Sequence, residues 1–153
     1  MLRGSQSLEN NPTFTLVVAG ALQREDGLWL MHKRPAHKQH GGLWEFPGGK
    51  VEVSEKQHEA LIRELHEELG IKAVPDAHDP IAEARDVTPS GGEGIVIALY
   101  TCRYWEGEPQ ALEGGAIGWF SPDQIHKLDK PPLDVVLTEK LFEELADKGL
   151  QRR

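Results

Sequence analysis

Residues 49–71 read GKVEVSEKQHEALIRELHEELGI, a loop followed by a segment with the spacing of an amphipathic helix. Ser54 followed three residues later by Gln57 is the pattern of a capping box, and Gly70 is a typical C-terminal stop. Between them, apolar residues recur at helical spacing: Leu61, Ile62, Leu65 and Leu69. The stretch therefore predicts a helix that is capped at Ser54, ends at Gly70 and buries one apolar face.

Three carboxylates of this helix lie on one flank. Glu64, Glu67 and Glu68 stand at i, i+3 and i+4, so their side chains converge beside the apolar stripe. Like charges at these spacings destabilise an exposed helix by roughly 0.2–0.5 kcal/mol per pair. A hard divalent cation such as Mg²⁺ takes oxygen ligands and would turn this repulsion into binding. A charge run by itself more often marks a solvated helix face, so the metal interpretation depends on the surrounding pattern.

The surrounding pattern is specific. The stretch fits G-x5-E-x7-R-E-U-x-E-E-x-G-U, where U is aliphatic, at nine fixed positions: Gly49, Glu55, Arg63, Glu64, Leu65, Glu67, Glu68, Gly70 and Ile71. In these residues the sequence resembles the Nudix hydrolase superfamily. Segments that resemble its MutT-type branch extend from about Thr13 to Leu141: Arg34-Pro35, the run 44–50, the run 105–109, Glu113 and the run 131–134.

An α+β fold follows both from the resemblance, which implies a Nudix-type α/β/α sandwich with a mixed sheet between helices, and from the residue pattern. Predicted strands cover 14–22, 28–33, 43–46, 81–87, 95–102 and 115–120, and helices run from Ser121 to about Leu128 and over 133–147. Glu25-Asp26-Gly27 predicts a hairpin turn between the first two strands. The strand 95–102 is so apolar that we expect both its faces to be covered. We expect one domain over 13–148, with tails at 1–12 and 149–153.

Composition excludes several classes of protein. Seventeen basic residues against 25 acidic ones, a net charge of −8, argue against a surface for duplex nucleic acid. No apolar run has the length of a membrane span and no signal peptide precedes the first strand, so we expect a cytoplasmic protein without a membrane partner, a monomer or weak homodimer. Cys102 lies in an apolar strand and is expected to be buried and inert. His37 and His40 lack further Cys or His ligands, so a solvated loop is favoured over zinc.

The resemblance implies a metal site and a reaction. Mg²⁺, with Mn²⁺ as a substitute, would be held by the Gly48 carbonyl, Glu64, Glu67, Glu68 and Glu113. Such a cluster suits hydrolysis at phosphorus, where a metal shields phosphate charge and activates water. Glu67 and Glu113 rank equally as the general base, and Glu64 is a further catalytic candidate. We expect Glu55 and Arg63 to fix the carboxylates electrostatically, and Gly49 to let the backbone approach the helix.

Substrate recognition is assigned less directly. Arg34 and Lys50 are the basic groups placed to meet phosphate oxygens, and Glu45, Phe46 and Pro47 lie at the base-pocket region of the MutT branch. Asp134 stands where members acting on oxidised guanine nucleotides typically have Asn. An ionised Asp only accepts hydrogen bonds and pairs naturally with an exocyclic amine such as cytosine N4. Glu93 likewise stands where those members carry Arg.

The combined features predict a Mg²⁺-dependent hydrolase that converts nucleoside triphosphates to monophosphate and pyrophosphate. The first substrate candidate is 8-oxo-dGTP, in nucleotide-pool sanitation and hence DNA repair, and CTP or 5-modified dCTP follows closely. A non-catalytic nucleotide-binding module predicts erosion of the box glutamates, and none is eroded. Hydrolases of sugar-linked dinucleotides usually carry longer recognition inserts or a dimerising N-terminal extension, whereas the segment before the first predicted strand is short here.

Overall fold

A computed structural model describes residues 14–86 and 94–149. Its elements are β1 (Phe14–Leu22), β2 (Trp29–Lys33), β3 (Trp44–Glu45), β4 (Gly48–Lys50), α2 (Gln57–Leu69), β5 (Lys72–Pro75), β6 (Ala82–Asp86), β7 (Gly94–Glu106), β8 (Ala116–Phe120), α3 (Pro122–Lys127) and α4 (Pro132–Asp147). The tail predicted at 1–12 and the position Glu93 lie outside the described residues. None of the helices among the described residues has the length and apolar character needed to cross a bilayer.

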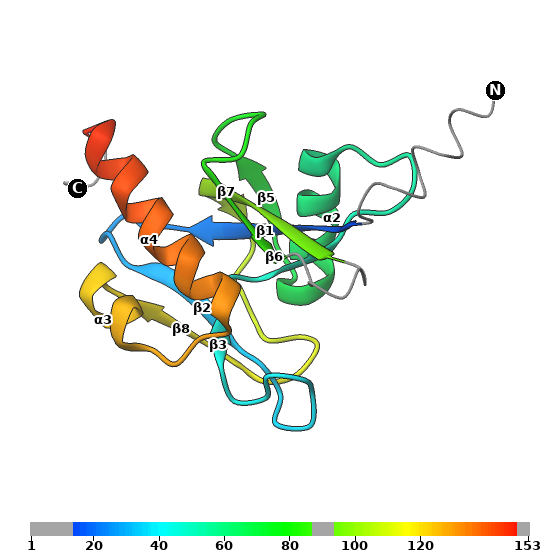
Figure 1. Ribbon diagram of the computed structural model, residues 1–153, viewed down its shortest axis with the longest axis horizontal. Helices are drawn as coiled ribbons and strands as arrows, with labels where there is room; N and C mark the ends of the chain where they lie inside the picture. Colours follow the sequence, from blue (N-terminus) through cyan, green and yellow to red (C-terminus); the bar gives the residue numbers. More distant parts are fainter. Residues whose placement is uncertain (1–13, 87–93, 150–153) are drawn as a thin grey trace.

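The strands form two sheets (Figure 1). The larger sheet has the order β4-β1-β7-β5. β6 also pairs with β7, along its first half, whereas β5 pairs with the second half. β1 and β7 are parallel from Phe14↔Gly94 to Leu22↔Cys102, while the other pairs of this sheet are antiparallel. The smaller sheet, β3-β2-β8, is antiparallel throughout. The larger sheet is therefore mixed, as predicted.

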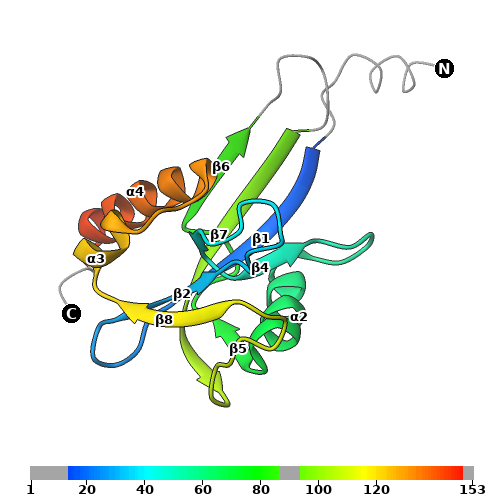
Figure 2. The same ribbon diagram turned by 90° about the horizontal axis from the view of Figure 1, so that it is seen from below.

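Alternating residues of β1 and β7 face two separate cores. Val18, Leu22, Ala98, Tyr100 and Cys102 pack with the α2 leucines, and Ala19, Ala21 and Leu99 pack with the α4 leucines. This alternation is the period of two expected of a strand covered on both faces. Figure 2 shows α2 and α4 on opposite sides of these strands. The expected helix-flanked sheet and the doubly covered strand are confirmed.

The box helix differs from the prediction at its start. Its N-cap residue is Lys56, and Ser54 lies before it with a φ of 70° in the left-handed region. The carboxylate of Glu59, three residues after Lys56, accepts the Lys56 N–H at 3.1 Å. Ser54 therefore does not cap the helix, because the loop bends there. The predicted stop is confirmed, since Gly70 has a φ of 75° and donates its N–H to the His66 carbonyl.

The apolar face of α2 also differs in one residue. Leu61, Leu65 and Leu69 are fully buried, and each contributes roughly 1.5–3 kcal/mol of stabilisation. Ile62, however, is 37% exposed, and Ala60 completes the buried face instead. The helix therefore presents a narrower apolar stripe than predicted, and its carboxylates flank it.

The turn at Glu25-Asp26-Gly27 forms, but the strands that it joins do not pair as a hairpin. The N–H of Arg24 donates to the Leu28 carbonyl at 2.9 Å, and only an isolated bridge joins Gln23 to Trp29. Beyond it, β1 enters the larger sheet and β2 the smaller one. The predicted hairpin is wrong because the chain changes sheets here.

The remaining elements lie close to their predicted bounds. Two short strands, β4 and β5, were not predicted, and β7 extends to Glu106. Ser121 caps α3, as predicted, by accepting the Gln124 N–H at 3.2 Å.

Cys102 is buried and free, and burial raises the pKa of its thiol to about 12. His37 and His40 are exposed in the loop between β2 and β3.

Candidate active site

A cavity of about 260 Å³ lies where the two sheets meet. Its lining combines acidic, basic and aromatic side chains from both sheets and from both large helices: His32, Arg34, Lys38, Glu45, Phe46, Glu68, Glu113 and Asp134, with Gly48 and Gly49 beside them. Eight predicted site residues thus meet in one cavity: Arg34, Glu45, Phe46, Gly48, Gly49, Glu68, Glu113 and Asp134. The lining does not include Pro47, Lys50, Glu55, Arg63, Glu64 or Glu67.

Glu68 is the buried carboxylate of the box helix, only 7% exposed. The Gly48 N–H donates to its Oε1 at 2.9 Å, and His32 Nδ1 lies 3.4 Å from its Oε2. Burial raises the pKa of Glu68 to about 7; His32 and the Gly48 N–H oppose this rise, and the charges of Glu45 and Glu113 add to it. The last turn of α2 therefore delivers a carboxylate that repels other negative charge in the cavity.

Glu64 lies directly against Gly49. A Cβ at Gly49 would come within 2.3 Å of the Glu64 carboxyl group, so a side chain at this position would displace that carboxyl group from its place beside β4. Burial raises the pKa of Glu64, Arg63 opposes the rise, and the charges of Glu67 and Glu113 add to it. The absence of a side chain on β4 is thus what allows this carboxylate to approach the strand.

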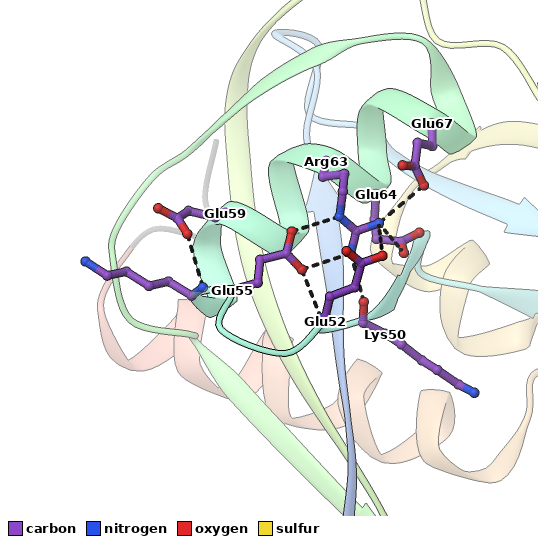
Figure 3. Close-up of polar contacts among 8 residues, drawn as sticks. Lys50, Glu52, Glu55, Glu59, Arg63, Glu64 and Glu67 are labelled. Atoms are coloured by element: carbon purple, nitrogen blue, oxygen red, sulfur yellow. Dashed lines mark hydrogen bonds and ion pairs between the residues drawn. The ribbon is translucent and has the colours of Figure 1, made fainter.

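Arg63 organises the acidic residues around it (Figure 3). Its Nε and Nη2 donate to the two Glu55 oxygens at 2.8 and 3.0 Å, and Nη2 also donates to the Lys50 carbonyl at 3.0 Å. Its Nη1 lies 2.9 Å from Glu64 Oε2 and 3.3 Å from Glu67 Oε1. Arg63 lowers the pKa of Glu55 to about 2, and Glu55 in turn raises the pKa of Arg63. One guanidinium therefore connects the loop, β4 and two carboxylates of α2.

The predicted bases occupy different surroundings. The Glu67 side chain is 49% exposed and paired with Arg63, whereas Glu113, in the loop between β7 and β8, lines the cavity. The two residues that the sequence ranks equally are therefore separated by geometry, because only Glu113 reaches the cavity wall.

The donor set fits a hard divalent cation. Glu64 and Glu68 both have raised pKa values, and Glu113 contributes to each rise, so several carboxylates influence one another across a small space. Carboxylate oxygens are the ligands that such cations prefer. The space above Gly49, which a Cβ would fill, already holds one of them.

His32 is a residue of this cavity that the sequence analysis did not single out. It is 3% exposed on β2, its Nδ1 lies 3.2 Å from Glu45 Oε2, and its Nε2 lies 3.0 Å from the Gly114 carbonyl oxygen. Burial alone would lower the pKa of His32. The hydrogen bonds to Glu45 and to the Gly114 carbonyl, together with the charges of Glu68 and Glu45, outweigh burial, so the pKa is raised. His32, Glu45 and Glu68 each offer a possible metal-binding atom within 4.8 Å of the others. The available signal was a polar residue that directly follows the apolar run Leu28–Met31 within a predicted strand.

Arg34 and Lys38 supply the basic side of the cavity. Arg34 donates from Nη1 to Glu45 Oε1 at 3.0 Å and from Nε to the Gln39 carbonyl at 2.7 Å, which fixes its guanidinium. Lys38 lines the same cavity and was not predicted. Lys50 has an exposed side chain outside the cavity lining, while its carbonyl accepts from Arg63.

Asp134 and Phe46 also line the cavity. Asp134, at the start of α4, is 6% exposed, and its Oδ2 accepts the Phe46 N–H at 3.0 Å. Burial raises the pKa of Asp134 to about 7. Phe46 is 3% exposed, and the neighbouring Pro47 carbonyl accepts the Gly20 N–H at 2.8 Å. The cavity therefore offers an aromatic surface and a buried carboxyl group, 88 residues apart in the chain.

Residues 13–141 match the model of the NUDIX domain. The chain belongs to the NUDIX family. This Nudix protein is 40% identical over 125 residues to the CTP pyrophosphohydrolase of Escherichia coli, covering 80% of this chain and 87% of that protein. It is 30% identical over 125 residues to the 8-oxo-dGTP diphosphatase of E. coli, covering 82% and 94%.

Solved structures agree with the fold of this Nudix protein. The solution structure of the E. coli ORF135 protein has a TM-score of 0.78 at 36% identity and covers 90% of this chain and 94% of its own. The MutT protein of Methanosarcina mazei Go1, at 20% identity, shares the fold with a TM-score of 0.74, over 90% and 97% of the two chains. The family resemblance inferred from the box is confirmed, and the protein is a hydrolase that acts on phosphoric anhydrides.

Proposed function

We propose that this Nudix hydrolase cleaves nucleoside triphosphates to monophosphate and pyrophosphate, with CTP or 5-modified dCTP as its preferred substrate. The observation that carries the choice of base is Asp134, a carboxyl group at the wall of the cavity that also holds Glu68 and Glu113. The similarity to a protein named CTP pyrophosphohydrolase supports it independently.

Asp134 has one oxygen available for a base. Oδ2 is held by the Phe46 N–H, and within residues 14–86 and 94–149 no hydrogen bond to Oδ1 is found. Above about pH 7 the ionised group only accepts, which suits the N4 amine of cytosine. Phe46, which lines the same cavity, would supply an apolar surface for the base.

The carboxylates of the box helix would hold the metal. Glu64, Glu67, Glu68 and the Gly48 carbonyl would bind Mg²⁺ or Mn²⁺, which leaves Glu113 free of metal to act as the base. When bound, the cation neutralises phosphate charge and lowers the pKa of a coordinated water. The chain itself supplies the remaining groups: Arg34 and Lys38 donate to phosphate oxygens, and Glu113 accepts the proton of the attacking water. Glu113 is favoured over Glu67 because it lines the cavity and Glu67 is paired with Arg63.

A second substrate, 8-oxo-dGTP, is favoured by one property of Asp134. With a pKa of about 7, a large share of the group is protonated near neutral pH and donates as well as accepts, as an Asn does. Several relatives carry the name 8-oxo-dGTP diphosphatase, including the E. coli protein at 30% identity. In that case the enzyme acts in nucleotide-pool sanitation.

Pyrophosphate release with Mg²⁺ tests the proposal across CTP, 5-methyl-dCTP, dGTP, 8-oxo-dGTP and ADP-ribose. We expect cytidine nucleotides to lead in the wild type, and Asp134→Asn to remove that lead. Asp147→Asn, an exposed substitution at the far end of α4, is the matched control and should leave the order unchanged. A lead for 8-oxo-dGTP would favour sanitation, and tight nucleotide binding without release would identify a non-catalytic module.

A further inference from the structure

We propose that His32 is a positioning residue that ties the loop carrying Glu113 to Glu68 on α2 and so fixes the separation of the two carboxylates. The inference deepens the proposed function, since it assigns Glu68 and Glu113 to one metal-dependent site. It concerns a side chain that neither the box nor the other MutT-like segments of the sequence include.

The His32 ring spans two parts of the fold. Nδ1 lies 3.2 Å from Glu45 Oε2 and 3.4 Å from Glu68 Oε2, while Nε2 lies 3.0 Å from the Gly114 carbonyl oxygen. A planar imidazole has its two nitrogens on different edges, so one rigid side chain contacts the two glutamates with one nitrogen and the Gly114 carbonyl with the other. The residue sits on the middle strand of the smaller sheet, opposite Glu45 on β3 and Ile117 on β8. Its backbone is therefore held on both sides.

The loop needs such an anchor because of its glycines. Gly114 and Gly115 follow Glu113 with φ values of 98° and 76°, a backbone region that glycine enters freely and other residues rarely adopt. A Cβ on Gly115 would come within 2.0 Å of the Lys33 carbonyl oxygen, so the chain passes close to β2 without a side chain to pack. The contact of the Gly114 carbonyl with His32 supplies a fixed point immediately after Glu113.

The other side of Glu113 is tied to the same helix. The Leu112 N–H donates to the Glu68 carbonyl at 3.1 Å, and the Gln110 N–H donates to the Leu69 carbonyl at 3.0 Å. These bonds satisfy carbonyls that the end of α2 would otherwise leave unpaired. Glu113 is thus flanked by two connections that both lead to Glu68, one through the backbone of Leu112 and one through the ring of His32.

A purely structural histidine would predict a different set of effects. Its loss would lower the melting temperature but leave turnover and metal affinity of the folded protein unchanged. A positioning residue predicts a lower kcat with little change in KM, weaker metal binding without nucleotide, and a loosened loop. These readouts separate the two roles even though His32 is buried.

The test compares His32→Phe, which keeps a ring without donors, with His32→Gln, whose single NH₂ group can replace only one of the two ring nitrogens. For His32→Phe we expect kcat with CTP to fall at least tenfold with KM within about twofold. Mn²⁺ affinity, measured by calorimetry without nucleotide, should fall at least fivefold. Amide hydrogen exchange over residues 112–116 should rise at least tenfold while that of β7 is unchanged. His32→Gln should lie between, and His66→Phe, exposed on α2, should match wild type.

If His32→Phe fails to fold, His32→Gln carries the test by the same three measurements. A folded variant with unchanged exchange over 112–116, unchanged Mn²⁺ affinity or unchanged kcat overturns the positioning role. A wild type without pyrophosphohydrolase activity contradicts the proposed function instead, while exchange and Mn²⁺ binding still report on His32.

Discussion

Glu68 and Asp134 are two carboxyl groups in one cavity whose pKa values burial raises to about 7, yet their neighbours give them different roles. Glu68 shares its surroundings with Glu45 and Glu113, so a cation relieves repulsion there. One oxygen of Asp134 accepts the Phe46 N–H, and under the proposed function the other would contact the base. Under the proposed function, the same chemical group would serve the phosphate chain at Glu68 and the base at Asp134.

Glu68→Gln should reduce kcat at least 100-fold with each nucleotide. The amide removes a charged oxygen ligand, and even residues that only support a metal ligand commonly account for 10–100-fold effects. Pyrophosphate release at saturating Mg²⁺ measures this, with Glu143→Gln on the exposed face of α4 as the control. A loss smaller than tenfold would count against the metal-dependent mechanism.

The ratio of kcat/KM for CTP to that for 8-oxo-dGTP should rise with pH through about 7. Below this pH Asp134 is largely neutral and both donates and accepts; above it the ionised group only accepts, which favours the cytosine amine. Titration of Glu68 and of the other carboxylates proposed to bind metal should affect both substrates equally and cancel in the ratio. In Asp134→Asn the ratio should be flat, so a wild-type slope that survives this substitution would exclude Asp134 as its cause.

Among the elements, the sequence predicts what is local and misses what depends on distant partners. The bounds of β1 match the prediction, and Arg63 pairs with Glu55 and Glu67 at the spacing expected. β4 has only three residues, two of them glycine, and β5 has four and ends in proline, so neither has the residue pattern of a strand. His32 has partners 13 and 82 residues away, and no local pattern reports such contacts.

Helix and turn signals were misleading in two places. Ser54 with Gln57 has the residues of a capping box, but Ser54 has a positive φ and the helix starts at Lys56 instead. The turn at 25–27 was predicted from its own residues, whereas the sheet that each flanking strand joins depends on packing elsewhere. The local sequence thus predicts the turn but not which sheet the following strand joins.

At the level of β4, Gly49→Ala should abolish most activity. The added methyl group meets the Glu64 carboxyl at 2.3 Å, so either the strand or the carboxylate must move. We expect kcat to fall at least tenfold and the melting temperature to drop by several degrees, measured by pyrophosphate release and calorimetry. Val53→Ala, at a side chain that is 95% exposed in the adjoining loop, is the control. Activity close to wild type would show that Glu64 tolerates displacement.

The whole molecule concentrates negative charge at one site in a chain that already carries a net charge of −8. A cation bound only by the folded state stabilises it by RT ln(1 + [L]/Kd), about 2.7 kcal/mol at 100 times Kd. For a domain of this size each kcal/mol corresponds to roughly 2–4 °C. Added Mg²⁺ should therefore raise the melting temperature by roughly 5–10 °C.

A matched salt series separates specific binding from screening. NaCl at equal ionic strength should give a much smaller rise, and Glu68→Gln should lose most of the Mg²⁺ effect. Equal stabilisation by NaCl and MgCl₂, or an undiminished effect in Glu68→Gln, would contradict a built metal site. The expected monomer or weak homodimer remains a prediction, which light scattering on the same samples would check.

The two large helices sit on opposite faces of one sheet, and each sends a single buried carboxyl group into the shared cavity. Under the proposed function, bond cleavage would depend on residues of α2 and the choice of nucleotide on residues of α4. Substitutions in the first turn of α4, in evolution or in a laboratory library, would then change substrate preference while the residues of α2 stay the same. We therefore expect new substrate specificities on this fold to arise from substitutions near residue 134, with the hydrolytic reaction retained.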